Sequence, residues 1–270
     1  MIYLFLYADS HRLTDKLIII FRTYIMNVIY FDSVPLMNTQ IHTLQLKGIK
    51  EIYTFDYFNE AVRQKIIGHL LSKIKDDNPI IVYSLCRTSV SSILYCYELS
   101  KIVTNKIHLC IMAPLLTLKK QDFTDLSHFG PPSGGHSIYH MFNNFKHNDA
   151  YVEIVNKVFQ DDKIHKVCFY SEDDKTIPAE FNQGIYENSK NLSVIKFLNT
   201  RLHNFFSLFY YGYSKNFEKF RKQSHYIDEA QLRMVSKIWE DDVNLDTLSH
   251  SILTNDFSIF EKYDFMSISS

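Results

Sequence analysis

The sequence predicts an α/β protein with three layers, in which a mostly parallel sheet is covered by helices and carries an inserted helical cap. Short apolar runs rich in β-branched residues alternate with segments of helical length along most of the chain. This alternation is typical of a parallel sheet that is buried on both faces. The rhythm breaks once, at residues 117–163, which contain the only Gly/Pro cluster and which we interpret as a cap or lid.

Composition narrows the class of protein further. The 270 residues include 29 basic and 30 acidic side chains, so the sequence has no charge excess that would favour nucleic acid or an anionic membrane. The mean hydropathy of −0.15 is ordinary for a folded globular protein. The four cysteines show no Cys-x-x-Cys spacing, so we expect reduced thiols, no structural zinc, no cofactor and a cytoplasmic location.

The elements follow each other in a regular order. The predicted strands lie at 28–31, 51–55, 80–83, 107–112, 166–170 and 193–198. The predicted helices lie at 39–47, 59–75, 87–103, 179–190 and 204–222. The resulting domain boundaries are an N-terminal extension (1–26), the first part of the core (27–116), the cap (117–163), the second part of the core (164–222) and a C-terminal helical tail (223–270).

The apolar bursts of the N-terminal extension are short. Charged residues interrupt them well before the roughly 20 residues that a membrane-spanning helix needs. No basic segment precedes the first burst and no small-residue cleavage site follows it, so we expect neither a membrane span nor a signal peptide.

Cys86 is the first candidate catalytic residue. An apolar strand, Ile80–Tyr83, runs directly into Ser84-Leu85-Cys86-Arg87-Thr88 and then into a helix. Small residues two places on either side of a nucleophile are needed where a strand turns sharply into a helix. A thiol at a helix N-terminus is shifted toward the reactive thiolate. The pattern therefore predicts a nucleophile elbow with cysteine in place of serine.

Two further candidates follow in chain order. Asp174 ends an acidic turn after the strand that follows the cap, and its neighbour Asp173 is the reserve. His203 lies in the loop after the last predicted strand, directly before a helix. A nucleophile, an acid and a histidine at the ends of successive strands are the parts of a catalytic triad in the order that α/β-hydrolases use.

The segment 28–206 resembles the α/β-hydrolase superfamily. Residues 80–90 are similar to its nucleophile elbow, residues 171–178 to its Gly-x-x-Asp-x-x-Val-Pro acid turn, and residues 202–205 to its histidine loop. The resemblance implies that Asp174 is the acid and that the backbone N–H groups of Arg87 and of Ser33 or Val34 form the oxyanion hole. Asp32-Ser33 stands where the family has His-Gly, and Ser84 and Thr88 stand where it has glycines.

The resemblance implies hydrolysis or transfer of an acyl group from an ester or thioester, with a small-molecule or carrier-bound acyl substrate. Cysteine at the elbow is similar to dienelactone hydrolases and some acyltransferases. One alternative is a catalytically inactive module of the same fold that binds a ligand or partner, favoured by the scarce glycines and by Asp32. A second alternative is a metal-dependent hydrolase that uses the cap histidines, which are His128, His136, His140 and His147.

Overall fold

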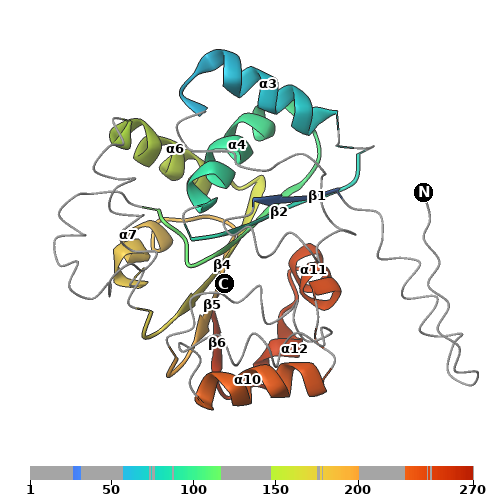
Figure 1. Ribbon diagram of the computed structural model, residues 1–270, viewed down its shortest axis with the longest axis vertical. Coiled ribbons are helices and arrows are strands. Elements are labelled where there is room, and N and C mark those ends of the chain that lie inside the picture. Colours follow the sequence, from blue (N-terminus) through green and yellow to red (C-terminus); the bar gives the residue numbers. More distant parts are fainter. Residues whose placement is uncertain are drawn as a thin grey trace, which may run out of the picture.

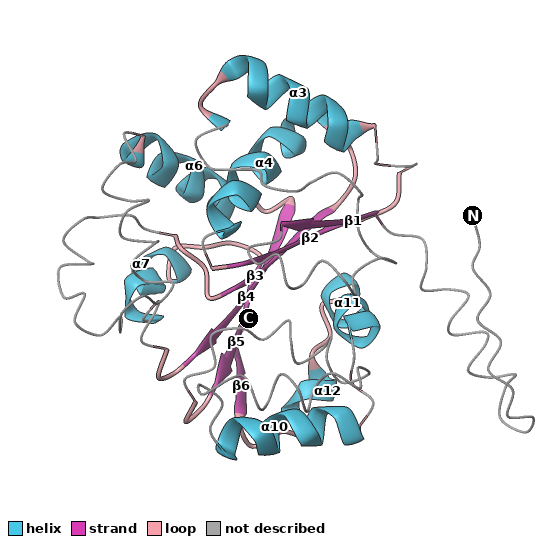
Figure 2. Cartoon of the chain, viewed as in Figure 1, coloured by secondary structure: helices cyan, strands magenta, loops and turns pink. Residues whose placement is uncertain are grey.

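A six-stranded sheet organises the chain. The computed structural model describes residues 27–31, 57–72, 74, 77–86, 88–116, 147–174, 177, 179–200, 229–241, 243 and 245–269. The strands are β1 (Asn27–Phe31), β2 (Ile80–Leu85), β3 (Ile107–Met112), β4 (Ile164–Ser171), β5 (Leu192–Phe197) and β6 (Met266–Ser269). They lie side by side in that order, β1 to β5 parallel and β6 antiparallel to β5 (Figures 1 and 2).

The central strands are buried along their whole length. All six residues of β2 and all six of β3 are buried, which is why they read as continuous apolar runs instead of alternating ones. Leu85 at the end of β2 pairs with Met112 at the end of β3, and Met112 pairs with Phe169 of β4. The carboxyl ends of the parallel strands therefore meet at one edge of the sheet.

The helices that connect the parallel strands share one face of the sheet. They are α3 (Glu60–Leu71), α4 (Thr88–Ile102), α6 (Asn148–Gln160), the short 3₁₀ helix η4 (Ala179–Asn182) and α7 (Gln183–Tyr186). Crossovers between parallel strands are right-handed, so strands that follow one another in a single direction place every crossover helix on the same side. Figure 1 shows α3, α4, α6 and α7 on that side.

The C-terminal helices cover the other face. They are α10 (Glu229–Glu240), α11 (Leu245–Thr254) and α12 (Ser258–Glu261). Consecutive side chains of a strand point to opposite faces of the sheet, so neighbouring residues of β2 contact different helix layers. The Ser84 hydroxyl bonds the hydroxyl of Ser92 in α4 at 2.7 Å, whereas the Tyr83 hydroxyl bonds that of Ser249 in α11 at 2.9 Å. The fold thus has the three layers that the sequence predicts.

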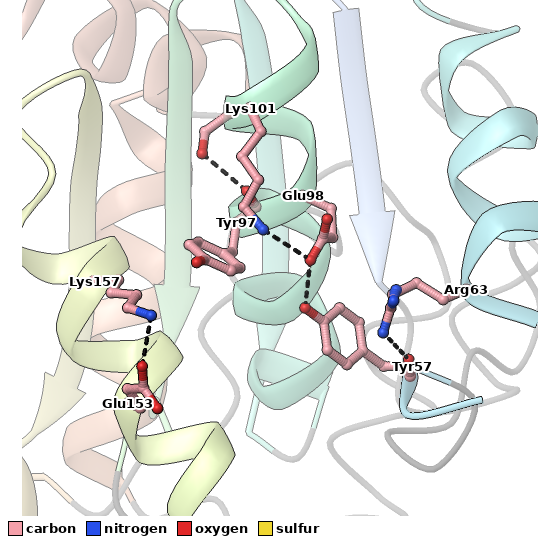
Figure 3. A network of polar contacts seen from close by, with 8 residues as sticks. Tyr57, Arg63, Tyr97, Glu98, Lys101, Glu153 and Lys157 are labelled. Carbon is pink, nitrogen blue, oxygen red and sulfur yellow. Dashed lines mark hydrogen bonds and ion pairs between the residues drawn. The ribbon is translucent and has the colours of Figure 1, made fainter. Parts of the chain in front are cut away.

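Helix α4 lies at the centre of its layer. Its first half is buried on every side, from Ser89 to Cys96, because the sheet lies beneath it and α3 and α6 pack beside it. A polar network crosses its exposed side (Figure 3). The Glu98 carboxylate accepts the Tyr57 hydroxyl at 2.6 Å and the Lys101 ammonium at 3.1 Å. This network fixes the segment that opens α3 against α4.

The fold class is confirmed. The structure differs from the predicted elements in three places. The helix predicted at 179–190 is shorter, ending at Tyr186. The Asn188 amide and the Ser189 hydroxyl bond the carbonyls of Gly184 and Ile185, which removes those acceptors from a continuing helix. The C-terminal tail contains β6 as well as helices, and α6 lies within the segment predicted as cap but packs against α4.

Other predictions fall outside the described residues. These are the extension 1–26, the helix at 39–47, the strand at 51–55, most of the cap (117–146) and the helix at 204–222. Within the part of the chain that the structure describes, no helix has the length and apolar character needed to cross a bilayer.

Candidate active site at the carboxyl edge of the sheet

Cys86 lies in a sharp turn from β2 into α4. Its N–H donates to the Met112 carbonyl at 2.8 Å, and its carbonyl accepts the N–H of Ser89 at 2.9 Å. One bond extends the sheet by a residue and the other begins the helix, so strand and helix meet at Cys86 itself. The residue is 9% exposed and has a φ of +54°. A non-glycine residue in this region of φ is strained by roughly 1–2 kcal/mol.

Two residues with a positive φ angle lie at the same edge of the sheet. Five described non-glycine residues have one, and three of them are asparagines, which tolerate this conformation well. The other two are Cys86 and Ala113, which follow the adjacent strands β2 and β3 at the same edge. The Ala113 N–H donates to the Phe169 carbonyl at 2.7 Å, so the strain is held by the sheet. Strain of this kind is concentrated at functional sites.

Ser84 and Thr88 occupy the two positions where an elbow normally has glycine. Ser84 is fully buried and its hydroxyl bonds Ser92, beneath the turn. The Thr88 hydroxyl lies 2.9 Å from the Phe31 carbonyl, 2.9 Å from the Leu85 carbonyl and 3.1 Å from the Leu85 nitrogen. Both side chains are therefore held inside the protein by hydrogen bonds, and the turn forms without glycine.

Asp174 lies beyond the end of β4 at the same edge as Cys86, with β3 between their two strands. Two strand spacings correspond to about 10 Å. Asp174 is 4% exposed, its N–H donates to the Ser171 carbonyl at 3.3 Å and its Oδ1 accepts the N–H of Ile177 at 3.3 Å. Asp173, by contrast, is exposed. Of the two candidates, Asp174 has the buried and oriented carboxylate.

The acid turn is tied to the segment that leads to His203. The Asp173 N–H donates to the Thr200 carbonyl at 3.0 Å, and the Glu172 N–H donates to the Phe197 carbonyl at 2.9 Å. The Glu172 carboxylate in turn accepts the N–H of Asn199 at 3.1 Å. Thr200 precedes the predicted histidine, His203, by three positions in the chain.

Several predicted site residues lie outside the described part of the chain. His203, Arg87, Ser33 and Val34 are among them, so the contacts of the predicted triad and oxyanion hole remain predictions. Of the cap histidines only His147 is described, and its ring stacks on Phe58 with centroids 4.2 Å apart. The described residues contain no group of three His, Cys, Asp or Glu side chains placed to hold a metal ion.

A buried polar cluster that the sequence analysis missed holds the segment 114–116, directly after β3. The N–H of Leu115 donates to the Ser89 hydroxyl at 2.9 Å, and its carbonyl accepts the hydroxyl of Tyr151. Asn182 donates to the Pro114 carbonyl at 2.8 Å and accepts the N–H of Leu116 at 3.3 Å. These four hydrogen bonds hold residues 114–116, which follow β3, against α4, α6 and η4. Only long-range contacts define this cluster, so local spacing gives no signal for it.

A second missed cluster lies near the opposite edge. The rings of His108 and His165, each the second residue of its strand, face each other with Nδ1 atoms 3.1 Å apart. His165 Nε2 lies 3.3 Å from the Ser193 hydroxyl, which donates to Asn255 at 3.0 Å. Burial lowers the pKa of His108 to about 3 and that of His165 to about 4. Both imidazoles are neutral and nearly inaccessible to solvent. Through Ser193 and Asn255 the cluster joins the end of α11 to the sheet.

No protein-family model matches the chain, and no curated protein matches its sequence. A His-tagged serine hydrolase involved in carbazole degradation (the CarC enzyme) is similar in structure over 50% of this chain, at 12% identity and a TM-score of 0.27. The matched region spans 62% of that hydrolase.

Two further solved structures are similar over a longer part of the chain. MGS-M2, an α/β hydrolase from a Medee basin deep-sea metagenome library, has 9% identity and a TM-score of 0.33 over 64% of this chain and 80% of its own. A structure described with LipS and LipT, two metagenome-derived lipolytic enzymes, has 9% identity and a TM-score of 0.33 over 68% and 74%. At these TM-scores the likeness defines neither a family nor an activity. The sheet topology and the strained Cys86 turn define an α/β protein with a candidate active site at the carboxyl edge.

Proposed function

We propose that the protein is an acyl hydrolase or acyltransferase of the α/β-hydrolase type, with Cys86, His203 and Asp174 as its catalytic residues. The substrate class is an ester or thioester of a small molecule or a carrier. The observation that carries the proposal is the φ of +54° at Cys86, in the turn that joins a buried strand to a buried helix. This is the backbone strain that exposes a nucleophile at the top of a parallel sheet.

The proposed reaction has two steps that conserve atoms and charge. The Cys86 sulfur attacks the carbonyl carbon while His203 accepts the thiol proton, and a tetrahedral intermediate forms. Its collapse expels the alcohol or thiol, which takes the proton back from His203, and leaves an acyl group on the sulfur. Water or another nucleophile then attacks the acyl carbon while His203 takes its proton, and the C–S bond breaks as His203 returns that proton to the Cys86 sulfur. Asp174 orients the imidazole and stabilises its charged form.

The oxyanion hole of this proposal uses backbone N–H groups. Arg87 directly follows Cys86, and Ser33 and Val34 follow β1, the strand next to β2. The strands that precede them in the chain, β1 and β2, are parallel neighbours and end at the same carboxyl edge of the sheet. Each donor aimed at the developing negative charge lowers the barrier by roughly 3–4 kcal/mol.

The choice of acid rests on burial. A triad carboxylate is shielded from water and held by hydrogen bonds. Asp174 meets this description and Asp173 does not. The hydrogen bond from the Asp173 N–H to the Thr200 carbonyl supports His203 as the partner, because Thr200 precedes His203 by three positions in the chain.

The test compares each catalytic residue with a matched neighbour. With p-nitrophenyl butyrate and S-phenyl thioacetate as substrates, we expect Cys86→Ala to lower kcat at least 100-fold and Cys96→Ala to leave it within threefold. We expect Asp174→Asn to lower kcat at least 10-fold, whereas Asp173→Asn, on an exposed side chain, has little effect. Full turnover in Cys86→Ala would exclude Cys86 as the nucleophile and with it the proposal.

A non-catalytic binding module is the second candidate, and the limited exposure of Cys86 favours it. Thiol reactivity distinguishes the two candidates. Burial raises the pKa of the thiols of Cys96, Cys110 and Cys168, which are fully buried. We expect iodoacetamide at pH 7.5 to alkylate Cys86 alone in the folded protein, as measured by peptide mass spectrometry. Absence of alkylation at Cys86, together with no turnover, would favour the binding module.

A further inference from the structure

Thr88 bridges the two strands that carry the proposed nucleophile and the proposed oxyanion loop. It is the first residue of α4, two places after Cys86, and its hydroxyl lies 2.9 Å from the carbonyl of Phe31, the last residue of β1. The same oxygen lies 3.1 Å from the nitrogen of Leu85, the last residue of β2. One hydroxyl therefore contacts the ends of both strands.

The hydrogen-bond roles of this hydroxyl are defined by its neighbours. A hydroxyl group has one proton to donate and two lone pairs that accept. The Leu85 nitrogen is a donor, so Thr88 accepts from it, and its own proton is available to the carbonyl of Phe31 or to that of Leu85, each at 2.9 Å. The resulting bridge runs from the Leu85 N–H through the Thr88 oxygen to the Phe31 carbonyl.

The position of the bridge gives it a chemical consequence. Phe31 immediately precedes Asp32, Ser33 and Val34 in the chain, and Leu85 immediately precedes Cys86. The bridge thus joins the last residue of β1, which precedes the proposed oxyanion donors in the chain, to the residue that directly precedes Cys86. A glycine at position 88, as in the usual elbow, has no side chain with which to make it.

We propose that Thr88 is a positioning residue, whose hydroxyl fixes the Cys86 turn against the end of β1, the strand that directly precedes the proposed oxyanion donors in the chain. This inference rests on the proposed function. Rates depend steeply on the placement of catalytic groups, since a displacement of about 1 Å costs on the order of 100-fold. The γ-methyl group of Thr88 cannot form a hydrogen bond, so we expect the effect on kcat to depend on the hydroxyl alone.

The test uses three substitutions at one position. Thr88→Val keeps the shape and removes the hydroxyl, Thr88→Ser keeps the hydroxyl and removes the methyl group, and Thr88→Ala removes both. With p-nitrophenyl butyrate we expect kcat to fall at least 10-fold in Thr88→Val and Thr88→Ala, with KM within threefold of the original. We expect Thr88→Ser to retain kcat within threefold.

Further readouts separate positioning from a purely structural role. Iodoacetamide should alkylate Cys86 at a similar rate in all folded variants, because the thiol itself is unchanged. If Thr88→Val does not fold, as judged by its thermal unfolding, the comparison of Thr88→Ala with Thr88→Ser decides the question. A kcat near the original in the folded hydroxyl-free variants overturns the proposal, as does an equal loss in Thr88→Ser.

The outcome is distinguishable from failure of the proposed function. If Cys86→Ala is inactive and the hydroxyl-free variants at position 88 are fully active, only the positioning role of Thr88 is wrong. If Cys86→Ala retains turnover, the proposed nucleophile is wrong and the role of Thr88 falls with it.

Discussion

The strained backbone at Cys86 predicts that glycine stabilises the protein at this position. We compare Cys86→Gly with Cys86→Ala, because both remove the thiol and differ only by a methyl group. A positive φ costs alanine roughly 1–2 kcal/mol relative to glycine, while glycine loses about 0.5–1 kcal/mol more conformational entropy on folding. The net expectation is that Cys86→Gly is about 0.5–1 kcal/mol more stable than Cys86→Ala.

Cys96 provides the matched control. It is a fully buried cysteine in the middle of α4, where glycine has no conformational advantage. There the glycine variant should be less stable than the alanine variant by about 1 kcal/mol. The change in the free energy of unfolding from the alanine to the glycine variant therefore has opposite signs at positions 86 and 96, and the two changes differ by about 1.5–2 kcal/mol.

Urea unfolding measures this difference directly. The four variants are unfolded in parallel at pH 7.5, and their midpoints are converted with a common slope. In a domain of this size 1 kcal/mol also corresponds to roughly 2–4 °C in Tm. If glycine destabilises position 86 as much as position 96, the backbone at Cys86 is not strained, and the observation that carries the proposed function is lost.

Three further predictions concern the interior. His108 and His165 have pKa values of about 3 and 4 in the folded protein, so both imidazoles are neutral there. In the unfolded chain each imidazole has the ordinary histidine pKa of about 6.5 and binds a proton below that pH. The free energy of unfolding should therefore be full above pH 6.5 and fall by roughly 1–2 kcal/mol per imidazole by pH 5; a flat urea profile between pH 7.5 and 5 would contradict this. Asn182→Ala should cost about 2 kcal/mol, because two buried hydrogen bonds of the chain that enters the predicted cap are lost, and an unchanged urea midpoint would show that water replaces the amide. Tyr83→Phe should cost about 1 kcal/mol, since it leaves the buried Ser249 hydroxyl without this partner, and calorimetry that finds no change in Tm would count against the contact.

The strands were predictable where burial on both faces leaves a continuous apolar run. The run at 107–112 matches β3 in full, and the run at 80–83 lies within β2, which continues through the polar residue Ser84 and through Leu85 up to the turn. Ser84 was not assigned to the strand because a serine normally ends an apolar run, whereas here its hydroxyl is paired inside the protein. The edge strand β6 was missed, since a four-residue segment with two serines carries no local signal.

The candidate site was only partly predictable. Local spacing suffices to select Cys86, because strand, small residues and helix follow each other directly in the sequence. The preference for Asp174 over Asp173 follows from the similarity of residues 171–178 to the acid turn, and the burial of Asp174, which the sequence alone does not reveal, supports it. The role of Thr88 required the partner carbonyl of Phe31, 57 residues away in the chain. Contacts of this range are set by the sheet order and not by any local motif.

The single direction of the strand order has a consequence for synthesis of the chain. Each crossover helix emerges from the ribosome soon after its strand and can cover the same face of the growing sheet at once. Among the described residues, the opposite face receives its helices, α10 to α12, only with residues 229–261. Until then side chains such as Tyr83, Cys110 and Phe169 lack that cover. A nascent chain that ends before residue 229 therefore lacks the described helices that cover this face of the sheet.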